Sequence, residues 1–271
     1  DHSCTFCIIP SCRGKSKSDS IEKISEEITK NLSQGVKEII LTGVDITSWN
    51  DEKNINLKLG DLLEKIFLKN KYNFRLRLSS IDAAEIDDKL LLLIKNEARL
   101  MPHFHFSLQS LDDMILKRMK RRHNVSQIIK LFEKIRNVCS KVTFGADFIT
   151  GFPTENEKMF LNTFKLIEQL QISHLHVFPY SQKEGTPACK MPQVEMHVRR
   201  KRAKLIRDLG KSIYRKILNE QKHVMHNILI ETGDGTGKTA NNFKVKSKLF
   251  KKGSLVKAIP TSISEDYLIV N

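Results

Sequence analysis

The chain has 271 residues and a mass of 31.2 kDa, with 46 lysines and arginines against 31 aspartates and glutamates, so its formal net charge is +15. A hydrophobic content of 40% with 14 phenylalanines is enough for a buried core, which excludes general disorder. No stretch approaches the roughly 20 apolar residues of a membrane span, and no signal peptide opens the sequence. We therefore expect a cytoplasmic protein without a membrane partner, and we also expect it to be a monomer.

The positive charge is concentrated near the C-terminus. Residues 1–195 hold 29 basic and 25 acidic side chains, whereas residues 196–271 hold 17 basic and 6 acidic ones. Such an asymmetry is typical of a unit that faces a polyanion. A generally lysine-rich composition would explain the charge equally well, so composition alone leaves both interpretations open.

Strand-like and helix-like segments alternate over the first two hundred residues. Parallel strands joined by helices predict a barrel or an open α/β sheet, in which functional groups gather at the carboxyl ends of the strands. The predicted strands lie at 38–44, 74–80, 103–110, 142–150 and 173–180. Polar pairs stand at their ends: Thr42-Gly43, Ser79-Ser80, Gln109-Ser110, Thr150-Gly151 and Tyr180-Ser181.

A different pattern follows a basic helix at about 195–222. Short strand-like segments at 228–231, 242–248, 254–259 and 266–270 are separated by glycine-containing turns without intervening helices. This pattern predicts a small all-β barrel. We place the boundary between an α/β domain and this β domain at 205/206, which gives domains 1–205 and 206–271.

The stretch 233–239, GDGTGKT, is similar to a phosphate-binding loop but departs from it in two ways. The spacing GxxxxGK(S/T) would place its first glycine at position 232, which is Thr232. A strand-like segment follows, where a phosphate-binding loop needs a helix. We therefore expect a turn here and not nucleotide hydrolysis.

Cys4 and Cys7 form a CxxC pair near the start of the chain. Alone, this spacing is compatible with half a zinc site, a redox pair, two ligands of an iron–sulfur cluster or chance. Five cysteines, an odd number, argue against a disulfide framework. Cys139 and Cys189 have no second cysteine at ligand spacing, so we expect them to be buried or incidental.

The cysteine pair begins an ordered set of motifs that resembles the radical S-adenosyl-L-methionine (radical SAM) methylthiotransferase family. Cys4-Thr5-Phe6-Cys7-Ile8-Ile9-Pro10, followed by Arg13-Gly14, is similar to the family's cluster loop. Further similar stretches occur in family order at 41–43, 77–80, 105–110, 119–123, 147–155, 178–181 and 185–188. Within the family, the stretches 107–110 and 176–181 most resemble the branch that adds a methylthio group to C2 of N6-threonylcarbamoyladenosine beside the tRNA anticodon.

The resemblance implies a partial (β/α)6 radical SAM barrel that lacks its first strand, followed by a barrel like the RNA-binding TRAM domain. It implies that Cys4 and Cys7 ligate a [4Fe–4S] cluster, which binds S-adenosyl-L-methionine. A second [4Fe–4S] cluster is expected in a missing N-terminal domain, and an electron donor is an expected partner. The cofactor-binding residues implied are Gly43, Ser79, Ser80, Gln109, Asp147 and Gly151.

The implied substrate is the anticodon arm of tRNA. The basic helix and the β module offer Arg200, Arg202, Lys244 and Lys246 for phosphate contacts. Phe243, Phe250 and Tyr267 stand close by in the sequence, where they could stack on bases.

Two departures from the family pattern keep other interpretations open. The first of the family's three cluster cysteines would lie immediately before Asp1, and Leu111 stands where the family has glycine. Cys12 could act as the third ligand, although it lies beyond a proline. The chain could also be a catalytically incomplete RNA-binding remnant, or a metabolic enzyme with zinc at its CxxC.

Several polar residues have no assigned role at this point. His103 and His105 share a strand face, and His174 and His176 repeat the spacing, which we interpret as incidental and not as a metal site. Arg121 and Arg122 could pair with a carboxylate or phosphate, or could belong to a solvated basic run.

Overall fold

All five predicted strands of the α/β domain are present and parallel. The computed structural model describes residues 2–51 and 56–271. One ladder pairs β1 (Glu38–Leu41) with β2 (Arg75–Leu78), and a second contains β3 (His103–Gln109), β4 (Thr143–Thr150) and β5 (His174–Pro179). Isolated parallel bridges from Leu76 to Leu100 and from Ile81 to Phe106 join the two ladders.

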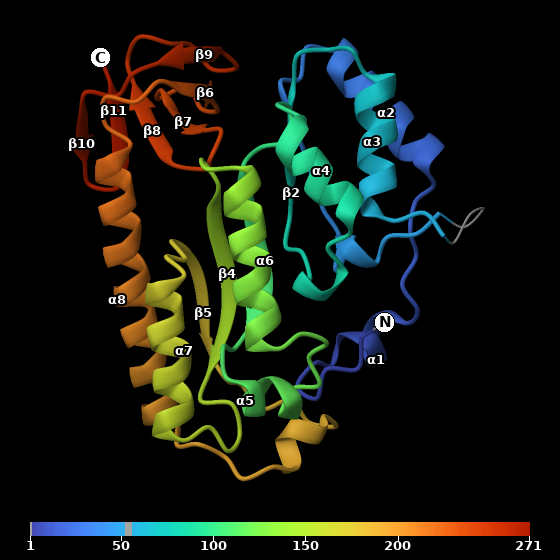
Figure 1. Ribbon diagram of the computed structural model, residues 1–271, viewed down its shortest axis with the longest axis vertical. Helices are drawn as coiled ribbons and strands as arrows, with labels where there is room; N and C mark the ends of the chain where they lie inside the picture. Colours follow the sequence, from blue (N-terminus) through green and yellow to red (C-terminus); the bar gives the residue numbers. More distant parts are fainter. Residues whose placement is uncertain (1, 52–55) are drawn as a thin grey trace.

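Helices between the strands cover one face of these ladders (Figure 1). Short polar side chains fix where several helices begin: those of Ser20, Asp87, Asn124 and Asn156 each accept a hydrogen bond from a backbone N–H of the first turn. The helices are α1 (Ile9–Arg13), α2 (Ile21–Ser33), α3 (Leu59–Lys69), α4 (Asp88–Asn96), α5 (Asp113–Arg118), α6 (Val125–Val138) and α7 (Glu157–Gln169), with 3-10 turns at Ile46–Ser48, Ala83–Glu85 and Pro187–Lys190.

The two faces of the ladders differ in chemistry because successive strand residues point to opposite sides. The helix-covered face is apolar and includes Phe106 and Phe144, which pack against Phe132 of α6. We call the opposite side the inner face. Its residues are largely polar: Glu38, Arg75, Arg77, His103, His105, Thr143, Asp147, His174 and His176.

The last quarter of the chain forms a separate sheet with its own core. Its strand order is β10-β11-β8-β7-β6-β9, and Leu218, Ile228, Phe243 and Leu268 belong to the apolar cluster behind it. The strands are β6 (His226–Ile230), β7 (Thr236–Thr239), β8 (Lys244–Ser247), β9 (Leu255–Ala258), β10 (Ser262–Ser264) and β11 (Tyr267–Val270).

A long basic helix, α8 (Met196–Glu220), connects the two parts and runs beside α7 and β5 (Figure 1). Position 205/206, where the sequence analysis places the boundary, falls inside this helix. Ile206 and Ile213 of α8 pack in the first core, whereas Leu218 packs in the second. The two parts therefore share one continuous helix.

The stretch 233–239 belongs to a hairpin, as expected, but only its first half is the turn, because Thr236–Thr239 is strand β7. Residues 231–235 connect antiparallel β6 and β7, and Gly235 has φ +82. A Cβ at Gly235 would overlap the carbonyl oxygen of Ser247, so a glycine is needed at this turn. No helix within the described ranges is long and apolar enough to cross a membrane.

Candidate functional site

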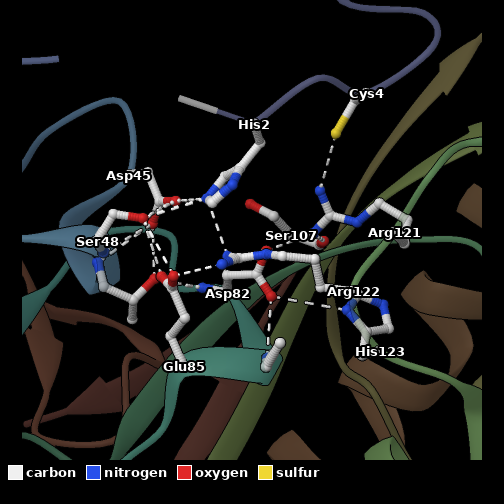
Figure 2. Close-up of polar contacts among 12 residues, drawn as sticks. His2, Cys4, Asp45, Ser48, Asp82, Glu85, Ser107, Arg121, Arg122 and His123 are labelled. Atoms are coloured by element: carbon white, nitrogen blue, oxygen red, sulfur yellow. Dashed lines mark hydrogen bonds and ion pairs between the residues drawn. The ribbon is translucent and has the colours of Figure 1, made fainter. Parts of the chain in front are cut away.

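The loops that follow the strands gather charged side chains around Asp82 (Figure 2). Arg121 and Arg122, beyond α5, donate to its Oδ2 at 3.0 and 3.2 Å, and His123 Nδ1 lies 3.7 Å from its Oδ1. Burial alone would raise the pKa of Asp82, but the nearby His123 imidazole and the charges of Arg121 and Arg122 hold it well below its ordinary value. Asp82 is therefore a buried carboxylate that orients two arginines.

Arg121 connects this carboxylate to the first cysteine. Its Nη1 donates to Cys4 Sγ at 3.5 Å, and its Nη2 donates to the carbonyl oxygen of Ser107 at 2.6 Å as well as to Asp82. The side chain is only 7% exposed, so its orientation is fixed from several sides. A positive charge is therefore held directly beside Cys4 Sγ.

Backbone bonds place the cysteine loop against α5 and the turn at 187–190. Thr5 N–H donates to Met119 O at 3.2 Å, and Ala188 N–H donates to Thr5 O at 2.9 Å. Within the loop, Cys7 N–H donates to Cys4 O at 3.1 Å, which forms a turn with both thiols half-buried. Cys12 lies on exposed α1, which has no buried residue.

A second polar group lies beside the first, between the loops after β1 and β2. His2 Nε2 is 2.5 Å from Asp45 Oδ2, and Ser48 Oγ donates to that same oxygen at 2.7 Å. Arg122 joins the two groups because it bonds to Glu85, His2 and Asp82 (Figure 2). The cysteine loop, the β1 loop and the β2 loop therefore form one continuous polar network.

Four of the predicted cofactor-binding residues lie at this carboxyl edge. Gly43 is exposed after β1, and Ser79 and Ser80 are half-buried after β2. Gln109 has φ +69 beside a register shift between β3 and β4, which is a conformation that non-glycine residues adopt mainly at functional or constrained sites.

Ser79 provides a test of whether the edge suits a bound group. Its Oγ is buried, and no described residue is within hydrogen-bonding geometry of it. Buried hydroxyls normally have a partner, so an unpaired one at a strand end fits a site for a polar ligand. Two half-buried thiols with Arg121 alongside likewise fit an anionic metal–sulfur group.

The other two predicted residues do not contact the Asp82 network. Asp147 lies on the inner face, where its hydrogen bonds are with His105 and His176. Gly151 has φ +63, and a Cβ there would overlap the side chain of Arg199 on α8. The glycine is therefore explained by helix packing. Leu111, where the family pattern has glycine, is fully buried in the core.

The predicted RNA contacts divide into exposed and buried residues. Arg200, Lys244 and Lys246 are exposed. Arg202 is not available to a phosphate, because its side chain is 7% exposed and its Nη1 pairs with Glu155 at 2.8 Å. Its assignment to RNA binding is corrected to a buried ion pair. Phe243 is likewise fully buried and cannot stack on a base.

Arg200 also lies far from the two lysines. The backbone N–H of Lys244 donates to Tyr214 Oη at 3.4 Å, and Tyr214 is 14 residues beyond Arg200 on α8. At 1.5 Å per residue, this separation is about 21 Å along the helix. The structure therefore does not gather the predicted basic residues into one patch.

Asp82, Asp45 and Glu85 belong to this network but were not predicted from the sequence. Asp82 stands two residues beyond Ser80, and Asp45 two residues beyond Gly43, both just past the carboxyl end of a strand. An acidic residue in that position of a parallel sheet was the available signal. Arg121 and Arg122, which pair with Asp82 and Glu85, were singled out, but their partners remained open.

Comparisons with known proteins find relatives that are similar over most of this chain. A threonylcarbamoyladenosine tRNA methylthiotransferase, MtaB, of Rickettsia prowazekii is 44% identical over 99% of this chain and 64% of its own length. MtaB of Thermotoga maritima is 33% identical over 83% of this chain and 52% of its own length. A tRNA-2-methylthio-N(6)-dimethylallyladenosine synthase of Bartonella henselae is 39% identical over 70% of this chain and 42% of its own length.

Solved structures agree on the fold. Coproporphyrinogen III oxidase of Escherichia coli, described as a radical SAM enzyme, has a TM-score of 0.54 at 15% identity and covers 83% of this chain and 56% of its own. The radical S-adenosylmethionine methyltransferase TsrM of Kitasatospora setae also reaches 0.54, at 13% identity, over 69% of this chain and 36% of its own. The family model of the radical SAM superfamily matches residues 1–167, and the chain therefore belongs to that superfamily.

Proposed function

We propose that this chain is the catalytic and RNA-binding part of a tRNA methylthiotransferase that modifies C2 of N6-threonylcarbamoyladenosine beside the anticodon. The chain spans about two thirds or less of the length of the relatives named above. Two of these relatives are named as threonylcarbamoyladenosine tRNA methylthiotransferases, and the one from Rickettsia prowazekii is similar over 99% of this chain. That similarity favours this branch over the dimethylallyladenosine branch.

The observation that carries the proposal is the cysteine loop fixed beside Arg121 and Asp82. Cys4 and Cys7 would hold a [4Fe–4S] cluster together with a third ligand, and Ser79 and Gln109 would contact S-adenosyl-L-methionine. When bound, the cluster and this cofactor supply a 5′-deoxyadenosyl radical. The residues of this chain orient these groups: Asp82 fixes Arg121, and Arg121 places a positive charge against Cys4 Sγ.

The two sheets also fit the fold expected of such an enzyme. The five parallel strands would be strands two to six of a (β/α)6 barrel, and the six-stranded sheet would be a TRAM-like module. An upstream domain with a second [4Fe–4S] cluster and an electron donor would complete the enzyme.

The position of the second sheet constrains how tRNA would bind. Arg75, Thr143 and His174, at the amino ends of their strands, bond to backbone carbonyls between Lys238 and Asn242. The exposed Lys244 and Lys246 follow this segment, whereas Cys4 lies at the carboxyl ends. An eight-residue strand such as β4 is about 26 Å long. The anticodon arm would therefore extend along the molecule, with its phosphates on the sheet and the modified base at the cysteine loop.

Deleting the gene tests the proposal. Mass spectrometry of tRNA nucleosides is expected to show loss of 2-methylthio-N6-threonylcarbamoyladenosine and accumulation of its unmethylthiolated precursor. The complete gene should restore the modified nucleoside. An unchanged nucleoside profile would contradict the proposed reaction. If the protein itself nevertheless binds tRNA, a noncatalytic RNA-binding protein would be favoured.

Replacing Arg121 with methionine tests the role given to that residue. A cation that donates an N–H to a ligand sulfur stabilises the reduced cluster, so the variant is expected to retain iron with a more negative reduction potential. Titration followed by electron paramagnetic resonance measures this potential. Arg122→Met is the matched control, because Arg122 bonds to Glu85, His2 and Asp82. Equal potentials in Arg121→Met and the unmodified protein would exclude the role.

A further inference from the structure

A second set of ligating side chains lies on the inner face, outside the network around Asp82. His105 of β3, Asp147 of β4 and His176 of β5 come from three adjacent strands. His105 Nε2 lies 3.0 Å and His176 Nδ1 lies 3.1 Å from the same oxygen, Oδ1 of Asp147. The two imidazole centroids are 4.5 Å apart. The function proposed above uses none of these three side chains.

The strand ladder holds this arrangement in place. Asp147 and His176 are register partners across β4 and β5, and His105 is the register partner of Gly145 across β3 and β4. A Cβ at Gly145 would overlap the His105 ring, so this glycine provides the space that the ring occupies. Ligands on rigid, hydrogen-bonded strands keep their geometry better than ligands on loops.

Two imidazoles and one carboxylate form a donor set that suits first-row divalent metals. One ligand atom from each of the three residues lies within 4.8 Å of the other two. We propose that His105, Asp147 and His176 bind one first-row divalent metal ion. The His176 side chain is 64% exposed, so the metal would keep open coordination positions on the solvent side.

A second cluster of similar composition shows why the first is the better candidate. His2, Asp45 and Glu85 also have ligand atoms within 4.8 Å of one another. There the guanidinium of Arg122 already bonds to both His2 and Glu85, so its charge would oppose a metal ion. Around Asp147, by contrast, the hydrogen bonds among the described residues are those with the two imidazoles. A metal ion would take the place of the N–H protons through which the two imidazoles bond to Asp147 Oδ1.

The structure also alters the interpretation of the histidine spacing. In the sequence, the repeated pairs His103/His105 and His174/His176 suggest four equivalent residues. Only one residue of each pair reaches the carboxylate, because His103 bonds to Thr143 and His174 bonds to the carbonyl oxygen of Asn242. The inner face therefore separates a structural histidine pair near the second sheet from a ligating pair beside Asp147.

A cobalt titration tests the proposal. The full chain carrying Cys4→Ala and Cys7→Ala, which removes the two thiols of the cluster loop, is freed of metal and titrated with Co²⁺. We expect one Co²⁺ per chain, with d–d absorption and without a sulfur-to-cobalt charge-transfer band. In this background, His176→Ala and Asp147→Asn should each weaken binding at least tenfold.

Asp45→Asn is the matched control, because it alters the other cluster and should leave cobalt affinity unchanged. His176 is exposed, so its replacement is expected to keep the fold, and circular dichroism of each variant checks this. Absence of stoichiometric binding would overturn the proposal. So would affinity that is unchanged in both His176→Ala and Asp147→Asn, or that falls only in Asp45→Asn.

Discussion

Replacing Glu38 with glutamine is expected to lower the free energy of unfolding of this chain by about 3–5 kcal/mol, because it leaves two buried guanidinium groups without their carboxylate. Glu38 Oε2 lies 2.6 Å from Arg75 Nε, and Oε1 lies 3.0 Å from Arg77 Nε. All three side chains are 7% exposed or less. Burial and the charge of Arg77 lower the pKa of Arg75 to about 10, at which it is still charged near pH 7.

The remaining N–H groups of both guanidiniums donate to the second sheet. Arg75 donates to the carbonyl oxygens of Lys238 and Thr239, and Arg77 donates to those of Thr239 and Ala240, at 2.8 to 3.2 Å. Glu38 therefore neutralises the two arginines that connect the β1–β2 ladder to the second sheet. Loss of its charge should weaken the attachment of the sheet as well as the strand pair β1–β2.

Urea unfolding followed by circular dichroism measures the effect. Glu64→Gln is the matched control: it also removes a glutamate from an ion pair, but the pair with Lys89 is exposed. Solvent and mobile ions screen such a pair, so the control should unfold at the same urea concentration as the unmodified chain. If Glu38→Gln unfolded at the same urea concentration as the control, the stabilising role proposed for Glu38 would be wrong.

Arg75 and Arg77 also illustrate what the sequence could and could not predict. Alternation of Arg75 and Arg77 with Leu76 and Leu78 correctly indicates a strand with one polar face. An alternating pattern normally places the polar face in solvent, yet both arginines are buried. Their carbonyl partners lie more than 160 residues away, and no local pattern encodes such a contact.

The basic helix shows the same limit. Its charge correctly predicts an exposed residue at Arg200, but Arg199 and Arg202, three positions apart, lie on one side of α8 and are buried. Which side packs inward depends on α7, whose Glu157 also pairs with Arg202, and on Glu155 before it. Composition alone cannot choose the buried side of a helix that carries cations on several sides.

The sequence correctly indicated where the candidate site lies, but not which side chains pair there. The strand-end rule led to Ser79 and Ser80, at the edge where Asp82 orients Arg121. That pairing joins residues that are 39 apart in the sequence, across α4, β3 and α5.

The strands β7 and β10 were missed because 236–239 and 262–264 are short and lack a hydrophobic alternation.

The largest functional effect is expected from the cysteine loop. In the anaerobically reconstituted product of the complete gene, Cys4→Ala and Cys7→Ala should each abolish nucleoside modification and remove the roughly four irons of one cluster. Both thiols are half-buried in a turn tied to α5, whereas Cys12 is exposed on α1. Iron analysis and absorbance of each variant measure the loss.

Cys12→Ala is the control that decides between the two ligand assignments. If the third ligand precedes this chain, Cys12→Ala retains its iron and its activity. Loss of iron in this variant equal to that in Cys4→Ala would instead place all three ligands between residues 4 and 12. Stoichiometric zinc in place of iron would contradict a cluster at this loop. Arg121 donates to Cys4 Sγ and not to Cys12. A shifted cluster reduction potential in Arg121→Met, together with an intact cluster in Cys12→Ala, would therefore support both the role of Arg121 and Cys4 as a cluster ligand.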